Sequence, residues 1–262
     1  MGFAFGYFKR VTTGKPIWVY QIGVFAVILI VWELIVRLRV IDTFFLASPM
    51  MILSCIGTVL KRPDIIQAFL TTLIEILIAY GLAAAFGVTL GMVLGLSDPL
   101  YRGANGIILM LYGVPKSMII PLFILYFGIG INSKIAFGAV HGFFPILLNT
   151  LAGARSVEPS MITMGRSLGA NRIQMFTRII FPSILPNAFT GLRLGMNHTL
   201  LGVLLAELFV SQKGIGYYIN LLTSTFKTEE LFAIIAALAA IAIVANGILG
   251  KFESRFSLWR QL

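Results

Sequence analysis

The sequence predicts an all-α membrane protein with six transmembrane helices. Of its 262 residues, 58% are hydrophobic and only 11% are charged, whereas soluble globular chains carry about a quarter charged residues. Apolar runs of roughly 20 residues, the length that a helix needs to cross the hydrocarbon core, recur along the chain. Strands of a transmembrane barrel would be about ten residues long with alternating polarity, and these runs do not alternate. The sequence therefore excludes an ordinary soluble enzyme.

Six apolar runs are the predicted spans, and an even number places both chain ends on one side of the membrane. The runs are 17–36, 68–96, 104–127, 135–154, 188–210 and 231–249. We expect both termini in the cytoplasm, because twelve Lys and Arg residues then face inward and seven outward, with Lys116 inside a span completing the 20. The first run is too long for a signal-peptide core and is interpreted as a retained span. The predicted domains are a cytoplasmic segment 1–16, a transmembrane domain 17–254 with a cytoplasmic loop 155–186, and a cytoplasmic tail 255–262.

Charge and cysteine content exclude two further classes of function. The formal net charge of +10 would suggest a nucleic-acid partner in a soluble chain, but here the basic residues flank apolar runs, as they do at membrane surfaces. Cys55 is the single cysteine, and one Cys with two His cannot supply a zinc or iron–sulfur ligand set. Metal and redox chemistry are not expected.

The loop 155–186 carries the most information about function. A short helical segment is expected before a break at Gly169 and Asn171, because a turn that needs positive φ favours these residues. A second segment, 172–180, has apolar residues three and four apart, which predicts a surface helix that could dock on a partner or on the bilayer. These residues are Ile173, Phe176 and Ile180. Pro182 is expected to stop this helix before the next span.

The same loop resembles the cytoplasmic signature of permease subunits of bacterial ATP-binding-cassette (ABC) importers. That signature reads Glu-Ala-Ala, three residues, Gly, nine residues, Ile, one residue, Leu-Pro. The matching positions here are Thr163, Met164 and Gly165, then Gly169, Ile179, Phe181 and Pro182, so the spacing is kept while the Glu-Ala-Ala is absent and Phe replaces Leu. Segments 113–130, 143–153, 166–172, 191–195 and 206–216 are similar, in order and spacing, to the nitrate, sulfonate, taurine and bicarbonate branch of that family.

The resemblance implies a type I importer fold and a set of partners. Two permease copies would form the pathway, two cytosolic ABC ATPase subunits would drive it, and a periplasmic or lipid-anchored binding protein would deliver a small anion or organic acid. No cofactor is expected on this chain. ATP and Mg²⁺ would be bound by the ATPase subunits, because Gly14 and Lys15 lack the rest of a phosphate-binding loop. The residues expected to couple to the ATPase are Thr163, Met164, Gly165, Arg166, Leu168, Gly169, Ala170, Asn171, Ile173, Phe176, Ile179 and Pro182.

Polar residues inside the spans are candidates for the translocation pathway. Burying such side chains in lipid costs free energy, so those that occur within a span usually have a function. The candidates are Lys116, His141, Asn149, Asn197, His198 and Glu207. Lys116 stands between Pro115 and Pro121, which should bend the helix, and it could favour an anion, reach the interface or neutralise a carboxylate. His198 could line the path or bond to Asn149 on the fourth span. For His141 helix packing is the alternative, and for Glu207 a structural role near the gate is favoured.

Other features of the spans are expected to be structural. Glu33 should pair with Arg37 one helical turn away, and Glu75 should find an interfacial or inter-helix partner. Small residues recur every fourth position in the second span, which predicts a stripe for close helix packing. They are Ala83, Gly87, Gly91 and Gly95. The segment 213–217 is expected outside the membrane, as a plain turn or as part of an outer gate.

Three functional classes follow from the sequence. Of these classes, an importer permease fits the sequence best. An ion-driven secondary transporter would predict carboxylates near the midplane, whereas Glu33, Glu75 and Glu207 lie toward the outer ends of their predicted spans. An intramembrane enzyme would need a catalytic pair at depth, and His141 with His198 is too sparse a set. Whether transport survives collapse of ion gradients while ATP remains would separate the first two classes.

Overall fold

The computed structural model describes residues 17–257, whose secondary structure consists of helices and connecting turns, with no strand among these residues. The predicted segment 1–16 and residues 258–262 of the predicted tail 255–262 lie outside the described residues, and α12 continues to Ser257. The chain divides into two compact units: residues 1–59 with 222–233, and residues 60–221 with 234–262. Each is described by itself.

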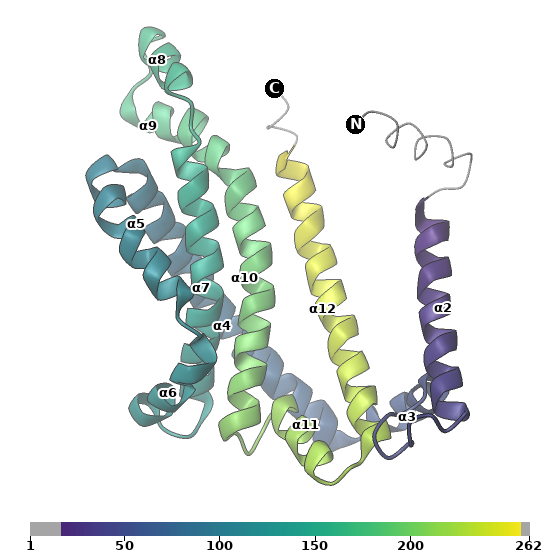
Figure 1. Cartoon of the computed structure of the whole chain (residues 1–262). Coiled ribbons are helices and arrows are strands. Elements are labelled where there is room, and N and C mark those ends of the chain that lie inside the picture. Colours follow the sequence, from purple (N-terminus) through teal and green to yellow (C-terminus); the bar gives the residue numbers. More distant parts are fainter. Residues whose placement is uncertain (1–16, 258–262) are drawn as a thin grey trace, which may run out of the picture. The chain divides into compact units, whose positions relative to one another are not determined.

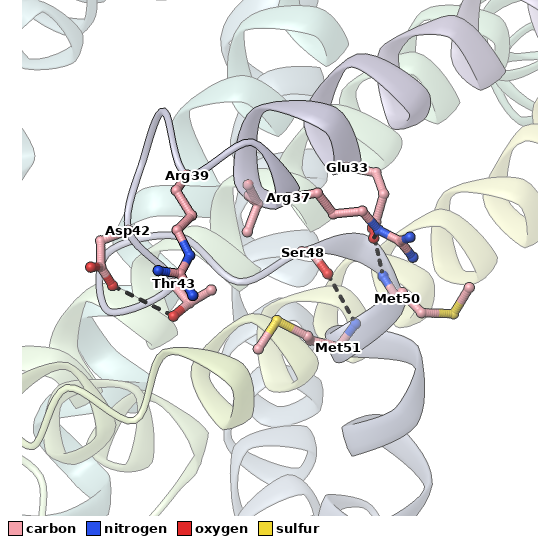
Figure 2. A pocket seen from close by; sticks show the side chains of 9 residues that line it. Glu33, Arg37, Arg39, Asp42, Thr43, Ser48, Met50 and Met51 are labelled. Carbon is pink, nitrogen blue, oxygen red and sulfur yellow. Dashed lines mark hydrogen bonds and ion pairs between the residues drawn. The ribbon is translucent and has the colours of Figure 1, made fainter.

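The first unit contains α2 (Ile17–Arg37), α3 (Pro49–Val59) and the start of α12 (Thr228–Ser257). Its small core is formed by Ala47, Ile52 and Ala233, with Trp32 and Phe232 packed against it. The predicted pair of Glu33 and Arg37 is confirmed at 2.6 Å, and the Met50 N–H also donates to Glu33 at 3.1 Å. These contacts tie the end of α2 to the start of α3. Figure 2 shows them beside an open pocket whose cavity volume is about 580 Å³.

The second unit is built on three long helices, α4 (Pro63–Leu96), α7 (Ile131–Arg155) and α10 (Phe181–Val210). Helix α7 lies in contact with both others (Figure 1). A Cβ added at Gly91 would come within 2.7 Å of the Thr150 Cβ and 2.9 Å of the Leu147 carbonyl oxygen. The small-residue stripe of α4 is therefore a packing face against α7, as predicted, and glycine is required where the two backbones approach so closely.

The remaining helices of the second unit lie around these three. They are α5 (Asp98–Gly113), the 3₁₀ turn η1 (Lys116–Ile119), α6 (Ile120–Phe127), α8 (Pro159–Ser167), α9 (Arg172–Met175), the π-helical turn η2 (Phe176–Ile180), α11 (Ile215–Ser224) and most of α12. Figure 1 shows α8 and α9 beyond one end of α7 and α10, and α6 beside the other end of α7.

The predicted third span is not one continuous helix. Helix α5 ends at Gly113, and the helical segment 116–127 follows at an angle of 83°. Pro115 has no N–H and disfavours helix in the residue before it, so the chain breaks there rather than only bending. Four helices of the described chain are long and apolar enough to cross a membrane, and the bent pair makes five. Helix α10 is 30 residues long but carries Arg193, Asn197 and His198, which lower its hydropathy.

The prediction that Pro182 stops the loop helix is wrong. Helix α9 runs through η2 directly into α10, where Pro182 occupies the first turn. A helix tolerates proline in its first turn, and the wider π-helical turn lets the two α-helices join without a break.

Candidate functional site

The connection between α7 and α10 is a compact helical loop. Helix α8 ends at Ser167, and Gly169 then adopts φ +75°, as its sequence context predicts. Asn171 caps α9 by accepting a 2.8 Å hydrogen bond from the Gln174 N–H, and the Gln174 side chain accepts from the Asn171 N–H at 3.0 Å. This reciprocal capping box satisfies two amides that would otherwise lack partners at the helix start. The turn between α8 and α9 is thus set by local sequence.

This loop displays apolar side chains to its surroundings. Leu168 is 79% exposed and Ile173 is 74% exposed, and Met164 and Phe176 are exposed as well. Gly165 instead faces inward and is buried, and a Cβ added there would come within 2.6 Å of the Ile179 Cδ1 atom. The other residues named for coupling vary in exposure. Thr163, Arg166, Gly169 and Asn171 are exposed, and Ala170, Ile179 and Pro182 are half-buried. The loop therefore has its own small core and an outward apolar surface.

A buried polar cluster joins the three long helices away from this loop. Thr72 and Glu75 of α4, Lys134 of α7 and Glu207 of α10 are each at least 96% buried. Lys134 forms an ion pair with Glu75. Glu207 accepts hydrogen bonds from the Thr72 hydroxyl and the Gly216 N–H, both at 2.7 Å. The expected inter-helix role of Glu75 and structural role of Glu207 agree with these contacts.

The same cluster holds the segment 211–216 against the helices. The Ile215 N–H donates to the Thr72 hydroxyl at 2.9 Å, and the Lys134 ammonium donates to the Ser211 hydroxyl at 3.1 Å. Gly214 has φ +104°, and a Cβ there would meet the Glu207 carboxylate. The expected turn at 213–217 is therefore packed tightly and leads into α11.

Sequence reasoning missed two members of this cluster. Lys134 is one of the seven basic residues expected on the outer side of the membrane, and nothing in the sequence indicated that it would be buried. It is 4% exposed, and the ion pair with Glu75 compensates for its burial. Thr72 carried no signal, since a threonine in an apolar run is ordinary. Glu75 is twelve residues into α4, about 18 Å along the helix, because α4 begins five residues before the predicted span.

Three of the predicted pathway residues lie near one another. The Lys116 ammonium donates to the Tyr112 carbonyl oxygen at 3.0 Å and lies 4.5 Å from the Tyr112 ring centre and 5.0 Å from that of Phe144. The ring centres of His141 and His198 are 6.1 Å apart. Phe144, whose ring lies beside the Lys116 ammonium, follows His141 by three residues on α7 and so lies about one helical turn from it. The break at Pro115 thus brings one ammonium and two imidazoles into one region.

The other predicted pathway residues lie apart from this group. Asn149 donates to the Pro145 carbonyl oxygen of its own helix at 2.8 Å, and the described structure has no hydrogen bond from it to His198. Asn197 instead pairs with Asn246 of α12 at 2.5 Å. Glu207 belongs to the buried cluster.

Comparison with known proteins places the chain in a family. Residues 87–258 match the binding-protein-dependent transport system inner membrane component family. The chain belongs to this family. The permease is 33% identical to the taurine transport system permease protein of Escherichia coli, over 91% of this chain and 89% of that protein. It is 27% identical to a nitrate import permease protein of Synechocystis, over 88% of this chain and 83% of the relative.

Solved structures show the same fold. An amino acid ABC transporter chain superposes with a TM-score of 0.59 at 20% identity, covering 80% of this permease and 98% of that chain. A chain of the methionine ABC transporter gives 0.62 at 14% identity, covering 73% and 95%. The chain is therefore an inner-membrane permease subunit with the ABC importer fold, rather than an enzyme, and the resemblance drawn from its motifs is confirmed.

Proposed function

We propose that two copies of this permease form the translocation pathway of an ATP-driven importer and couple to cytosolic ATPase subunits through the loop 161–182. The observation that carries the proposal is the exposed apolar surface of that loop, whose second helix, α9, continues through η2 into α10. An apolar helix face of this kind fits into a groove on a partner protein. The ATPase subunits would bind ATP and Mg²⁺. No nucleic-acid partner is proposed.

The geometry of the loop suits the transfer of motion. Helix α9 continues without a break through η2 into α10, so a displacement of α9 would be passed to the span as movement of one rigid element. At the other end, α8 is linked to α7 by residues 156–158. The Arg155 guanidinium at the end of α7 forms an ion pair with Asp98 of α5 and lies over the Tyr101 ring. Closure of two ATPases would draw the loops of two permeases together and open the pathway on the other side of the membrane.

The proposed substrate is a small anion or organic acid delivered by a periplasmic or lipid-anchored binding protein. Support comes from the relatives, whose names specify taurine and nitrate. A secondary transporter is the alternative. Its coupling carboxylates would be Glu75 and Glu207, but these are engaged by Lys134, Thr72 and the Gly216 amide.

Affinity purification of the permease from its native membrane in mild detergent tests the proposal. We expect a soluble subunit with a phosphate-binding loop to co-purify in stoichiometric amount. The double variant Leu168→Ser with Ile173→Ser should lose that subunit, because it removes the two most exposed apolar side chains of the loop without touching the loop core. Ile129→Ser is the matched control: Ile129 is equally exposed, at 73%, but follows α6.

Two results would contradict the proposal. Retention of the ATPase by the double variant would mean that the loop is not the docking surface. A permease that purifies alone and transports in ATP-free vesicles under an ion gradient would instead support the secondary transporter.

A further inference from the structure

We propose that Lys116, His141 and His198 form a binding site for a small oxyanion, a sulfonate, carboxylate or nitrate. The inference rests on the proposed function, in that the anion bound there is the transported substrate. It goes further by assigning the residues and the chemistry that recognise it.

The first argument is the position of Lys116 at a helix break. Its ammonium has three N–H donors, and the Tyr112 carbonyl oxygen accepts one of them. The rings of Tyr112 and Phe144 lie beside the ammonium and hold it by cation–π contact. Lys116 is half-buried, so its charge is held in place with donors still unused.

The second argument is the absence of a counter-ion. In the described part of the second unit, no carboxylate forms an ion pair with Lys116, His141 or His198. The described carboxylates of that unit have partners elsewhere. Arg62 pairs with Asp64, Lys134 with Glu75, Arg155 with Asp98 and Arg193 with Glu253, while Ser160 donates to Glu158 and Thr72 to Glu207. A partly desolvated cation without a counter-ion is unfavourable, and a bound anion would compensate for it.

The third argument is an unsatisfied buried group. His141 is only 9% exposed, and its Nδ1 has no hydrogen-bond partner. Buried polar atoms normally have partners, and exceptions call for an explanation such as a ligand. The ring of His141 lies 5.2 Å from that of Phe137 and 6.1 Å from that of His198. Phe144, 5.0 Å from the Lys116 ammonium, follows His141 by three residues on α7, which places the two imidazoles in the same region as the ammonium.

The chemistry of the region defines the ligand. An oxyanion has several acceptor oxygens, so it can take hydrogen bonds from the ammonium and from an imidazole N–H together. The rings of Phe144 and Tyr112 offer apolar surface for a short organic portion. A cation would be repelled, and a neutral molecule would leave the charge of Lys116 uncompensated.

Histidine NMR tests the site directly, because the chain has only two His and both belong to it. The full permease, labelled with ¹³C,¹⁵N-histidine in lipid nanodiscs, would be titrated with methanesulfonate and, separately, with the neutral dimethyl sulfone. We expect methanesulfonate to shift both imidazole signals saturably and the sulfone to leave them in place. Lys116→Met should weaken the apparent affinity roughly tenfold or more, since one partner of a desolvated charge pair is lost. Lys116→Arg should keep binding, and so should Lys61→Met, which removes an exposed lysine before α4.

The site is refuted if methanesulfonate moves neither signal, if dimethyl sulfone moves them equally, or if folded Lys116→Met binds as the unchanged permease does. None of these readouts involves ATP or the partner subunits. Failure here leaves co-purification of the ATPase intact, whereas failure of the proposed function appears as loss of that subunit from the purified permease.

Discussion

The Lys134 ammonium of α7 forms an ion pair with the Glu75 carboxylate of α4, and both side chains are almost completely buried. Residues 59 positions apart in the sequence thus neutralise each other between two long helices. Lys134 also donates to the Ser211 hydroxyl, so the pair connects the helices to the segment before α11.

Breaking this ion pair should destabilise the permease strongly. Lys134→Met is expected to lower the free energy of unfolding by about 3–5 kcal/mol, because it leaves a buried carboxylate without its cation. The combined Lys134→Met and Glu75→Leu variant should recover much of this loss. Thermal unfolding in detergent measures both, with exposed Lys213→Met as the control. Equal destabilisation by the single and the combined variants would show that the charge pairing is not the cause.

Thr72 should control the stability of the segment before α11. Thr72→Val keeps the shape of the side chain but removes the donor to Glu207 and the acceptor for the Ile215 N–H. We expect a loss of about 1–3 kcal/mol and faster hydrogen exchange over residues 211–217. The neighbouring Thr71→Val is the control, because the Thr71 hydroxyl donates to the Gln67 carbonyl oxygen of its own helix. Unchanged exchange in Thr72→Val would contradict this role.

The close approach of α4 and α7 should make Gly91 sensitive to one added methyl group. Gly91→Ala is expected to destabilise the permease by about 1–3 kcal/mol, because the new Cβ would contact Thr150 and the Leu147 carbonyl oxygen. Gly81→Ala in the same helix has open space around its Cβ and should be neutral or slightly stabilising. Thermal unfolding of the two variants side by side makes the comparison. If Gly91→Ala does not lower the stability, α4 and α7 do not approach each other as closely as the structure shows.

The turn at Gly169 should be needed for coupling, if the loop docks as proposed. Gly169 has φ +75° and open space around it, so the penalty of a side chain lies in the backbone. Gly169→Val should uncouple ATP hydrolysis from transport, because a β-branched residue disfavours a positive φ. Gly169→Asn should keep most of the coupling, because Asn tolerates this conformation. Transport per ATP hydrolysed in proteoliposomes is the measurement. Normal transport by the valine variant would disprove the coupling role.

The reactivity of Cys55 should depend on pH in a defined direction. Partial burial raises the pKa of the Cys55 thiol above its ordinary value, and the charges of Glu230 and Glu229 raise it further. The thiolate is the reactive form, so alkylation by iodoacetamide should rise with pH around a midpoint above that of a free cysteine. Glu230→Gln should lower this midpoint. Because Cys55 is the chain's single cysteine, mass spectrometry reports its alkylation without background. A midpoint at or below that of free cysteine would contradict the inferred environment.

Several features followed from the sequence because their physical causes are local. Composition and run length predict a helical membrane protein, since only a long apolar helix satisfies its backbone in lipid. The Glu33 and Arg37 pair, the turn at Gly169 and the small-residue stripe of α4 each depend on residues within a few positions of one another. The loop motif indicated the family only together with the similar segments 113–130, 143–153, 166–172, 191–195 and 206–216.

Other features were decided by tertiary structure alone. The sequence placed Glu75 and Glu207 within spans, but it did not show that Lys134 would meet Glu75, or that Thr72 and the Gly216 amide would meet Glu207. It also suggested a stop at Pro182, where a π-helical turn instead carries the helix onward. Local propensity does not determine these outcomes, because a buried charge takes whichever partner helix packing brings within reach.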